Sequence, residues 1–191
     1  MKIGVDIDDT ITNSWPTLSK EYSKVLGISE YDLIKDKPYY SKVIQEKYTM
    51  EEYFKKITPI NDKINPILPI KDNVKEVIDK LYELGHTITF ITARGLETTN
   101  PYEITKKFLE DNKIKHEKLI LAPFDKAKSC KEEKIELFID DSIKHCTAVQ
   151  NEGIEVLMFE TKYNKEHSGF KHVKDWQEIY NIIKNRWYNA K

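Results

Sequence analysis

The sequence predicts an α/β fold: a doubly wound, Rossmann-like parallel sheet with a small helical cap inserted after the first strand. From residue 72 onward, short apolar runs alternate with segments of helical periodicity. Parallel neighbours in a sheet need a long crossover connection that packs back over the sheet, so this alternation is typical of a parallel sheet. Residues 14–71 break the alternation with short helical pieces and no convincing strand, which indicates an insertion.

Five apolar runs predict the strands of the sheet. The first run opens the chain, and the others are separated by stretches long enough to hold crossover helices. The expected strands cover residues 2–7, 86–92, 118–122, 135–140 and 154–160.

The helices between these strands combine apolar residues at helical spacing with recognisable ends. In 71–85 the apolar positions form one stripe, and Gly85 stands where a left-handed cap would end the helix. In 100–112 Asn100 takes the N-cap position and Pro101 the first helical position. Further helices are expected over 126–134, 142–153 and 173–191, the last with an apolar stripe of Trp176, Ile179, Ile183 and Trp187.

The chain is expected to divide into an α/β core of residues 1–13 and 72–191 and a cap of residues 14–71. The cap region is rich in aromatic rings, which either form the core of a small helical unit or stack against a nucleobase. These residues are Trp15, Tyr22, Tyr31, Tyr39, Tyr40, Tyr48, Tyr53 and Phe54.

Composition limits the function classes. The chain has 191 residues, 39% of them hydrophobic and 33% charged, with a formal net charge of −1. This balance is typical of a soluble globular domain and argues against a nucleic-acid polymer as partner. No run of about 18 apolar residues indicates a membrane span, and two cysteines without a disulfide pattern favour a cytoplasmic location.

Polar residues follow the ends of several predicted strands. In an open parallel sheet, ligands bind beyond the carboxyl ends of the strands, so these residues are expected to meet at one site. Acidic residues this dense repel one another, which calls for a cation or a chemical role. The candidates in chain order are Asp6, Asp8, Thr92, Arg94, Lys126, Lys128, Asp140 and Asp141.

This set resembles the motifs of the haloacid dehalogenase superfamily of phosphotransferases. The Asp-x-Asp-x-Thr motif of that family is matched by DIDDT over residues 6–10, and its strand-closing threonine by Thr92 in FITAR. The acidic pair is matched by Asp140 and Asp141 in FIDDS. The resemblance covers residues 1–13 and 72–160, and the order of the motifs agrees with the family throughout.

The resemblance and the chemistry of carboxylates imply roles for these residues. Asp6 can attack phosphorus to form an aspartyl-phosphate, while Asp8 can protonate the leaving oxygen and then deprotonate water. Mg²⁺ is the expected cofactor, held by Asp6, the Asp8 carbonyl and Asp141, with Asp140 in the outer coordination sphere. The expected substrate-binding residues are Thr92, Ala93, Arg94 and Lys126.

Two of these assignments leave alternatives open. Lys126 and Lys128 both fit the catalytic lysine, and Lys126 is favoured because it lies at the mouth of its helix. Arg94 is either a phosphate or substrate contact or a surface residue.

Three further residues are expected to play structural parts. Thr10 and Ser142 are expected to cap the helices that follow them. The histidines have no metal-binding spacing, and a metal or thiol role for His145 beside Cys146 is not expected.

The overall arrangement looks most like the deoxyribonucleotidase-like branch of the superfamily, which implies a small phosphorylated substrate, a nucleoside monophosphate. The alternatives within the enzyme class are a sugar-phosphate phosphatase and a phosphomutase. Outside it are a phosphoacceptor resembling a response-regulator receiver and a binding protein without turnover. The sequence leaves the oligomeric state open, a homodimer included.

Overall fold

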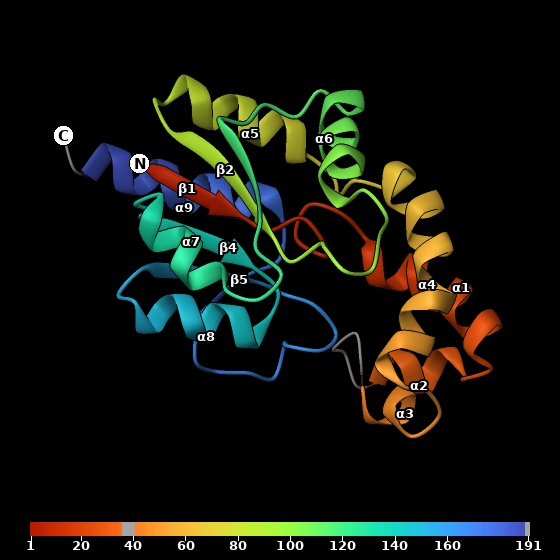
Figure 1. Ribbon diagram of the computed structural model, residues 1–191. Helices are drawn as coiled ribbons and strands as arrows, with labels where there is room; N and C mark the ends of the chain where they lie inside the picture. Colours follow the sequence, from red (N-terminus) through yellow and green to blue (C-terminus); the bar gives the residue numbers. More distant parts are fainter. Residues whose placement is uncertain (36–40, 190–191) are drawn as a thin grey trace.

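The computed structural model describes the backbone of residues 1–35 and 41–189, and side chains over 1–33 and 41–185. Within these residues six parallel strands form one sheet in the order β3-β2-β1-β4-β5-β6 (Figure 1). The strands are β1 Lys2–Val5, β2 Thr87–Thr92, β3 Lys118–Leu121, β4 Leu137–Asp140, β5 Glu155–Phe159 and β6 Lys171–Val173. The predicted fold class is therefore confirmed.

The order of the strands reverses between β1 and β4. From β1 the chain winds outward through β2 to β3, and it then returns to place β4 on the other side of β1. The backbone N–H of Asp6 donates to the carbonyl of Ile139 at 2.9 Å, so the two strands stay paired up to their ends. The crevice beyond these ends is where ligands bind in doubly wound sheets.

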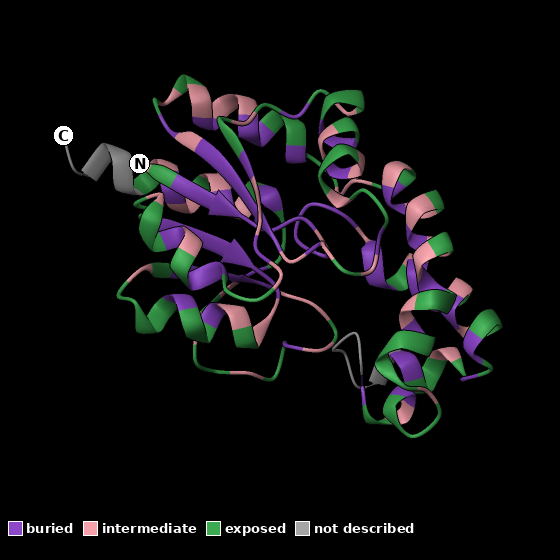
Figure 2. Ribbon diagram, in the orientation of Figure 1, coloured by how far each residue is buried: buried purple, intermediate pink, exposed green. Residues whose placement is uncertain are grey.

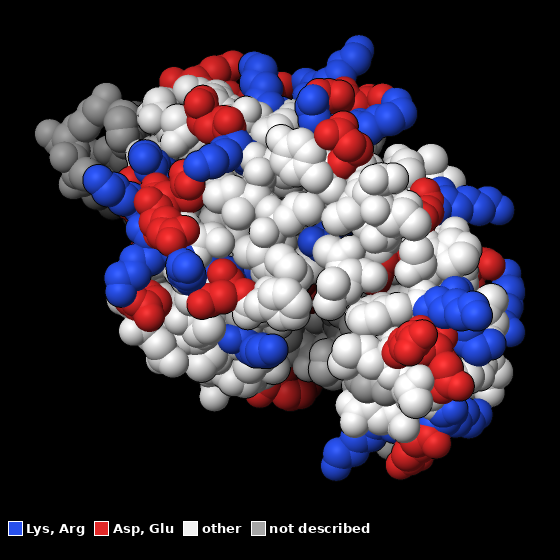
Figure 3. Space-filling view, viewed as in Figure 1, with Lys and Arg blue, Asp and Glu red and all other residues white. Residues whose placement is uncertain are grey.

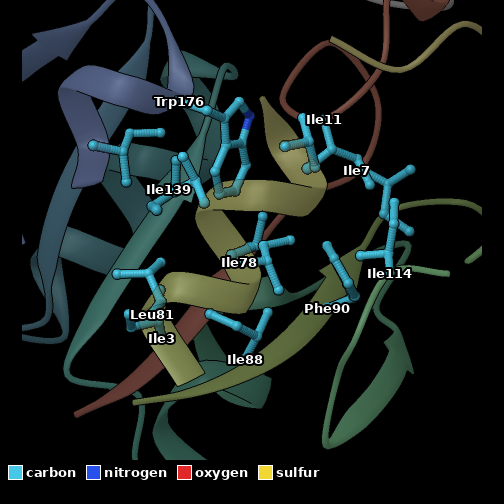
Figure 4. Close-up of a cluster of buried hydrophobic side chains, with 14 of the residues drawn as sticks. Ile3, Ile7, Ile11, Ile78, Leu81, Ile88, Phe90, Ile114, Ile139 and Trp176 are labelled. Carbon is cyan, nitrogen blue, oxygen red and sulfur yellow. The ribbon is translucent and has the colours of Figure 1, made fainter. Parts of the chain in front are cut away.

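Helices cover both faces of the sheet (Figure 1). One face packs on α5 Val74–Glu83, α6 Pro101–Asp111 and α9 Trp176–Asn189, through a core that includes Ile78, Phe90 and Trp176 (Figure 4). The other face packs on α7 Lys126–Glu132 and α8 Ile143–Asn151 through a second core with Phe138. Figure 2 shows β1 and β4 buried along almost their whole length, as expected of strands covered on both sides.

The helix ends follow local chemistry in most places. Gly85 lies beyond α5 with a positive φ of 80°, as its predicted capping role requires. The Ser142 hydroxyl accepts a hydrogen bond from the backbone N–H of His145, so its capping role is confirmed. The prediction for Thr10 is wrong: α1 (Ser14–Leu26) begins four residues later with Asn13 at its N-cap position, because a turn intervenes after β1.

The terminal helix packs as predicted over the residues whose side chains are described. Trp176, Ile179 and Ile183 of α9 are fully buried against the sheet. The indole N–H of Trp176 donates to the carbonyl of Thr10 at 3.1 Å and so ties α9 to the turn after β1. The side chain of Trp187 lies outside the described residues.

The segment 14–71 is helical and has a hydrophobic cluster of its own. Its elements are α1 Ser14–Leu26, α2 Glu30–Lys35, α3 Lys42–Gln45, α4 Met50–Ile64 and the 3₁₀ turn η1 Asn65–Ile67. Trp15, Tyr22 and Tyr53 are buried in edge-to-face ring contacts, so these rings form the core of the cap. Tyr39 and Tyr40 lie outside the described residues.

Two short chain segments connect the cap to the core. Thr12 and Ile70 form an antiparallel bridge, flanked by hydrogen bonds from Asn13 N–H to the Pro69 carbonyl and from Lys71 N–H to the Ile11 carbonyl. In Figure 1 the helices α1 to α4 stand beside the carboxyl ends of β1 and β4. This arrangement places the helices of the predicted cap segment beside the crevice.

No helix in the described part of the chain combines the length and the apolar character needed to cross a bilayer.

Candidate active site

The predicted acidic residues gather at the carboxyl ends of β1 and β4. Asp6 directly follows β1, and Asp140 closes β4 with Asp141 next to it. All three residues are at most 5% exposed. The turn after Asp6 is sharp, because Asp9 takes a positive φ of 60° and its carboxylate accepts the backbone N–H of Trp15. Asp8 therefore points into the crevice from the same turn.

Lys126 lies between two of these carboxylates. Its Nζ is 2.6 Å from Asp6 Oδ1 and 2.7 Å from Asp140 Oδ2, and the side chain is buried. Lys128, the alternative, points into solvent and lies 3.9 Å from the Glu132 carboxylate. Of the two lysines, the structure brings Lys126 to the acidic cluster.

The acidic cluster has the composition of a site for a hard cation. Oxygen atoms of Asp6, Asp140 and Asp141 lie within 4.8 Å of one another. Burial raises the pKa of Asp6; Lys126 opposes this rise, and the charges of Asp140 and Asp8 add to it. One lysine does not neutralise three adjacent carboxylates, so a divalent cation fits the donor set and its charge.

Asp8 forms a bidentate ion pair with Arg94. The guanidinium donates from Nε to Asp8 Oδ2 and from Nη2 to Asp8 Oδ1, both at 2.8 Å. The Ser14 hydroxyl donates to Asp8 Oδ1 at 2.5 Å. Arg94 is 2% exposed, so the alternative of a surface residue is wrong. The reason is its position at the end of β2, where the chain turns back over the crevice.

Replacing Arg94 should cost stability as well as activity. Arg94→Met leaves a largely buried Asp8 carboxylate without its counter-ion, and we expect a loss of about 3 kcal/mol in the free energy of unfolding. Arg94→Lys keeps the charge but not the planar fork, so its loss should be smaller. Urea unfolding of the three proteins measures both values, and equal stability of Arg94→Met and wild type would contradict the ion pair.

Thr92 stands behind the crevice and does not line it. Its side chain is fully buried, and its hydroxyl accepts the backbone N–H of Arg94 at 3.3 Å. This bond fixes the start of the loop that carries Ala93 and Arg94, both of which face the cavity.

Sequence reasoning missed two residues of the site. His145 lines the cavity with Nδ1 3.5 Å from Asp140 Oδ2; its place in the first turn of α8 after the acidic pair was the signal available. Asn164 is buried and donates to the carbonyls of Asp141 and Phe159, both at 2.8 Å. Asn164 thus positions the Asp141 loop, and it stands in no motif.

A cavity of about 690 Å³ lies between the cap and the core. Asp6, Asp8, Lys126 and Asp141 form its polar end. Much of the remaining lining is apolar or aromatic and comes from the cap and from core loops: Tyr53, Phe54, Ile57, Leu96, Pro123, Phe124, Ile143 and Tyr163. In Figure 3 the middle of the molecular face is mostly uncharged, and the charged side chains lie mainly around its rim.

Comparisons with known proteins show what this chain resembles. No family model matches the sequence. A nucleotidase of Clostridium acetobutylicum is 28% identical over 188 residues, which cover 96% of this chain and 93% of that protein. A crystal structure described as a predicted phosphoglycolate phosphatase from Haemophilus somnus superposes with a TM-score of 0.69 at 19% identity, covering 95% of this chain and 96% of the other.

A third relative extends the fold comparison. A haloacid dehalogenase-like hydrolase from Streptococcus pneumoniae superposes with a TM-score of 0.68 at 10% identity, covering 95% of this chain and 97% of that one. The chain therefore shares its fold with haloacid dehalogenase-like hydrolases, and this likeness agrees with the family resemblance and the enzyme class predicted from the sequence. The Clostridium relative, matched over nearly the whole chain, is named a nucleotidase.

Proposed function

We propose that the protein is a Mg²⁺-dependent phosphomonoester hydrolase that acts through an aspartyl-phosphate, as a 5′-nucleotidase on nucleoside or deoxynucleoside monophosphates. One observation carries the proposal. The Asp6 carboxylate lines a substrate-sized cavity, with its Oδ1 2.6 Å from Lys126 Nζ and with Asp8, two residues on, in the same lining. A nucleophile, a cation for the phosphoryl charge and a proton donor thus share one face of the cavity.

The reaction divides into two displacements. In the first, an Asp6 oxygen attacks phosphorus, the bond to the leaving oxygen breaks, and Asp8 gives that oxygen a proton. In the second, water attacks the aspartyl-phosphate, Asp8 takes the proton of the water, and the Asp6 carboxylate is released with inorganic phosphate. Asp8 ends each cycle as it began, with its proton returned.

The ion pair with Arg94 favours the ionised form of Asp8, which is the form needed to accept the proton of the attacking water. The first displacement needs the protonated form, so Asp8 must take up a proton, from solvent or from the phosphate monoester monoanion, as the substrate binds and Arg94 loosens from it. A phosphoryl group accepts hydrogen bonds from a guanidinium, and it therefore competes with Asp8 for Arg94. This exchange gives Arg94 a role in substrate binding as well as in the free enzyme.

Asp6, Asp141 and the carbonyl of Asp8 would hold the Mg²⁺, with Asp140 in the outer sphere hydrogen-bonded to Lys126. Bound there, the cation screens the repulsion between the Asp6 carboxylate and the phosphate dianion and supplies charge for the transition state. Asp140 also accepts the backbone N–H of Ser142 at 2.7 Å, which keeps its carboxylate oriented toward Lys126.

The lining of the cavity supports a nucleoside as leaving group over a bare sugar. A base has two apolar ring faces, and stacking on aromatic side chains stabilises it. Phe54, Phe124 and Tyr163 line the part of the cavity beyond the reacting end. The lining also holds hydrogen-bonding groups, Glu97, Lys144 and His145 among them, but its larger part is apolar, which favours a base over a polyhydroxylated sugar. The name of the Clostridium relative points the same way.

The test is phosphate release from a panel of nucleoside, deoxynucleoside and sugar monophosphates, each with Mg²⁺ and with excess EDTA. We expect turnover of nucleoside monophosphates, loss of at least about 100-fold in rate with EDTA, and recovery on adding Mg²⁺. A preference for sugar phosphates would overturn the assignment of a nucleotide substrate, while the assignment of a phosphatase activity would stand. Turnover unaffected by EDTA would overturn the metal dependence.

A phosphoacceptor gives a different result in the same assay. Incubation with acetyl phosphate would then leave a long-lived label on the protein, and no ester would release phosphate. Binding of a nucleotide without any turnover would indicate a binding protein.

A further inference from the structure

Glu97 is a carboxylate in the cavity that the reaction scheme above does not use. It lies on the loop between β2 and α6, three residues after Arg94, and it lines the cavity together with Tyr53, Phe54 and Ile57 of α4. Its carboxylate accepts the backbone N–H of Gly95 at 3.2 Å. Among the residues that the structure describes, no side chain donates a hydrogen bond to it.

The position of Glu97 is fixed by the cap. The side-chain amide of Asn61 on α4 donates to the Glu97 carbonyl at 2.9 Å, and the Tyr22 hydroxyl orients that amide through Asn61 Oδ1 at 2.6 Å. Two residues after Glu97, Thr99 donates both its backbone N–H and its hydroxyl to the carboxylate of Asp62, which follows Asn61 on α4. Glu97 is thus held at a defined place in the cavity, with little freedom to turn away.

Backbone N–H groups satisfy only part of the acceptor capacity of the Glu97 carboxylate, which has about four lone-pair sites. Burial raises the pKa of the Glu97 carboxyl, the backbone N–H groups of Glu97 and Gly95 lower it, and the charge of Asp8 raises it further. A polar group in an apolar surrounding is costly unless it is hydrogen-bonded. A ligand that brings a donor to this point would remove that cost.

We infer that Glu97 is a specificity-determining residue that accepts a hydrogen bond from a hydroxyl group of the leaving group, close to the phosphoester. The inference rests on the proposed function, because it takes the cavity as the substrate site. Glu97 lies on the same loop as Arg94 and close enough to Asp8 for the Asp8 charge to act on it. The atoms that reach it are therefore those just beyond the phosphate, which in a nucleotide belong to the sugar.

The same carboxylate argues against a second phosphate near this point. An anion placed beside Glu97 would be repelled. Of the cations in the cavity lining, Arg94 is engaged by Asp8 or by the reacting phosphate and Lys126 by Asp6 and Asp140, while Lys144 belongs to α8. The substrate class that fits is a monophosphate ester whose alcohol carries at least one further hydroxyl.

The experiment compares substrates that differ by one hydroxyl. One pair is thymidine 5′-monophosphate and its 3′-deoxy analogue, and the second, without a base, is 2-hydroxypropyl phosphate and propyl phosphate. We expect the wild-type protein to favour the hydroxylated member of at least one pair by about tenfold or more in kcat/KM. Glu97→Leu should reduce this ratio by about tenfold, whereas Glu97→Gln, which keeps an acceptor oxygen, should retain most of it.

Glu117→Gln is the matched control, since Glu117 is exposed on the loop before β3 and away from the cavity. Thermal melting identifies any variant that fails to fold, and Glu97→Gln, nearly isosteric with the native residue, then provides the comparison. An unchanged ratio in Glu97→Leu, with both substrates slowed equally, would overturn the inference while leaving the phosphatase intact. If the wild-type protein hydrolyses no ester of either pair, the proposed function itself is contradicted.

Discussion

Asp6→Asn should abolish phosphoester hydrolysis, with kcat lower by at least about a thousandfold, because the amide cannot act as the nucleophile. The side chain keeps nearly the same shape, so the folded structure should persist. Steady-state phosphate release from the best nucleoside monophosphate measures the loss, and circular dichroism checks the fold. A labelling experiment adds a second readout, since the wild-type protein should incorporate phosphate from substrate on rapid acid quench and the variant should not.

Asp9→Asn is the matched control in the same turn. Asp9 has a positive φ of 60°, which asparagine adopts readily, and the amide oxygen can still accept the backbone N–H of Trp15. We expect activity within a few-fold of wild type. If Asp6→Asn retained wild-type turnover, another group would have to be the nucleophile, and the aspartyl-phosphate mechanism would fall.

Lys126→Met should damage both stability and turnover. Without the ammonium group, Asp6 and Asp140 face each other with no cation between them, so we expect a loss of about 3–5 kcal/mol in the free energy of unfolding near neutral pH. The pKa of Asp6 is already raised by burial, and removal of Lys126 raises it further. The carboxyl then takes up a proton as the pH falls, so the loss should be smaller at pH 5 than at pH 8.

Lys128→Met provides the comparison that separates the two lysines. Its side chain is exposed, and the nearby Glu132 carboxylate is 3.9 Å away, so its removal should change stability by less than about 0.5 kcal/mol. Denaturant unfolding at pH 5 and pH 8 measures the stability of each variant, and phosphate release measures its turnover. Loss of turnover in Lys128→Met with normal turnover in Lys126→Met would reverse the assignment.

Much of the fold could be predicted because buried parallel strands are continuous apolar runs. The five predicted runs correspond to β1 through β5, with ends displaced by up to two residues. The sixth strand was missed because Lys171–Val173 is short and only Val173 is buried. Three residues at the edge of a sheet carry too little periodicity to be recognised.

The division into a core of 1–13 and 72–191 and a cap of 14–71 stays a prediction. Separate hydrophobic clusters and the narrow connection at Thr12 and Ile70 agree with it. Which cap residues would meet a substrate could not be predicted, because the burial of Tyr22 and Tyr53 and the exposure of part of Phe54 depend on how the helices pack.

The acidic site was accessible from the sequence for a topological reason. Parallel strands end at one edge, so residues that follow the strands must meet there whatever the details of packing. That reasoning brings Asp6 and Asp8 together with Asp140 and Asp141, although they are more than 130 residues apart in the chain. The roles assigned to them remain to be tested by the variants above.

The sequence by itself thus determined the parallel sheet, the order of its motifs and the edge at which the acidic residues collect, because strand patterning and chain connectivity fix them. Only the tertiary structure decided which lysine reaches Asp6, since both lie in α7 and its packing buries the one at its start. It also decided that Arg94 pairs with Asp8 and that Glu97 faces the cavity. These contacts depend on how the loop after β2 folds over the crevice, and no local sequence pattern encodes that loop conformation.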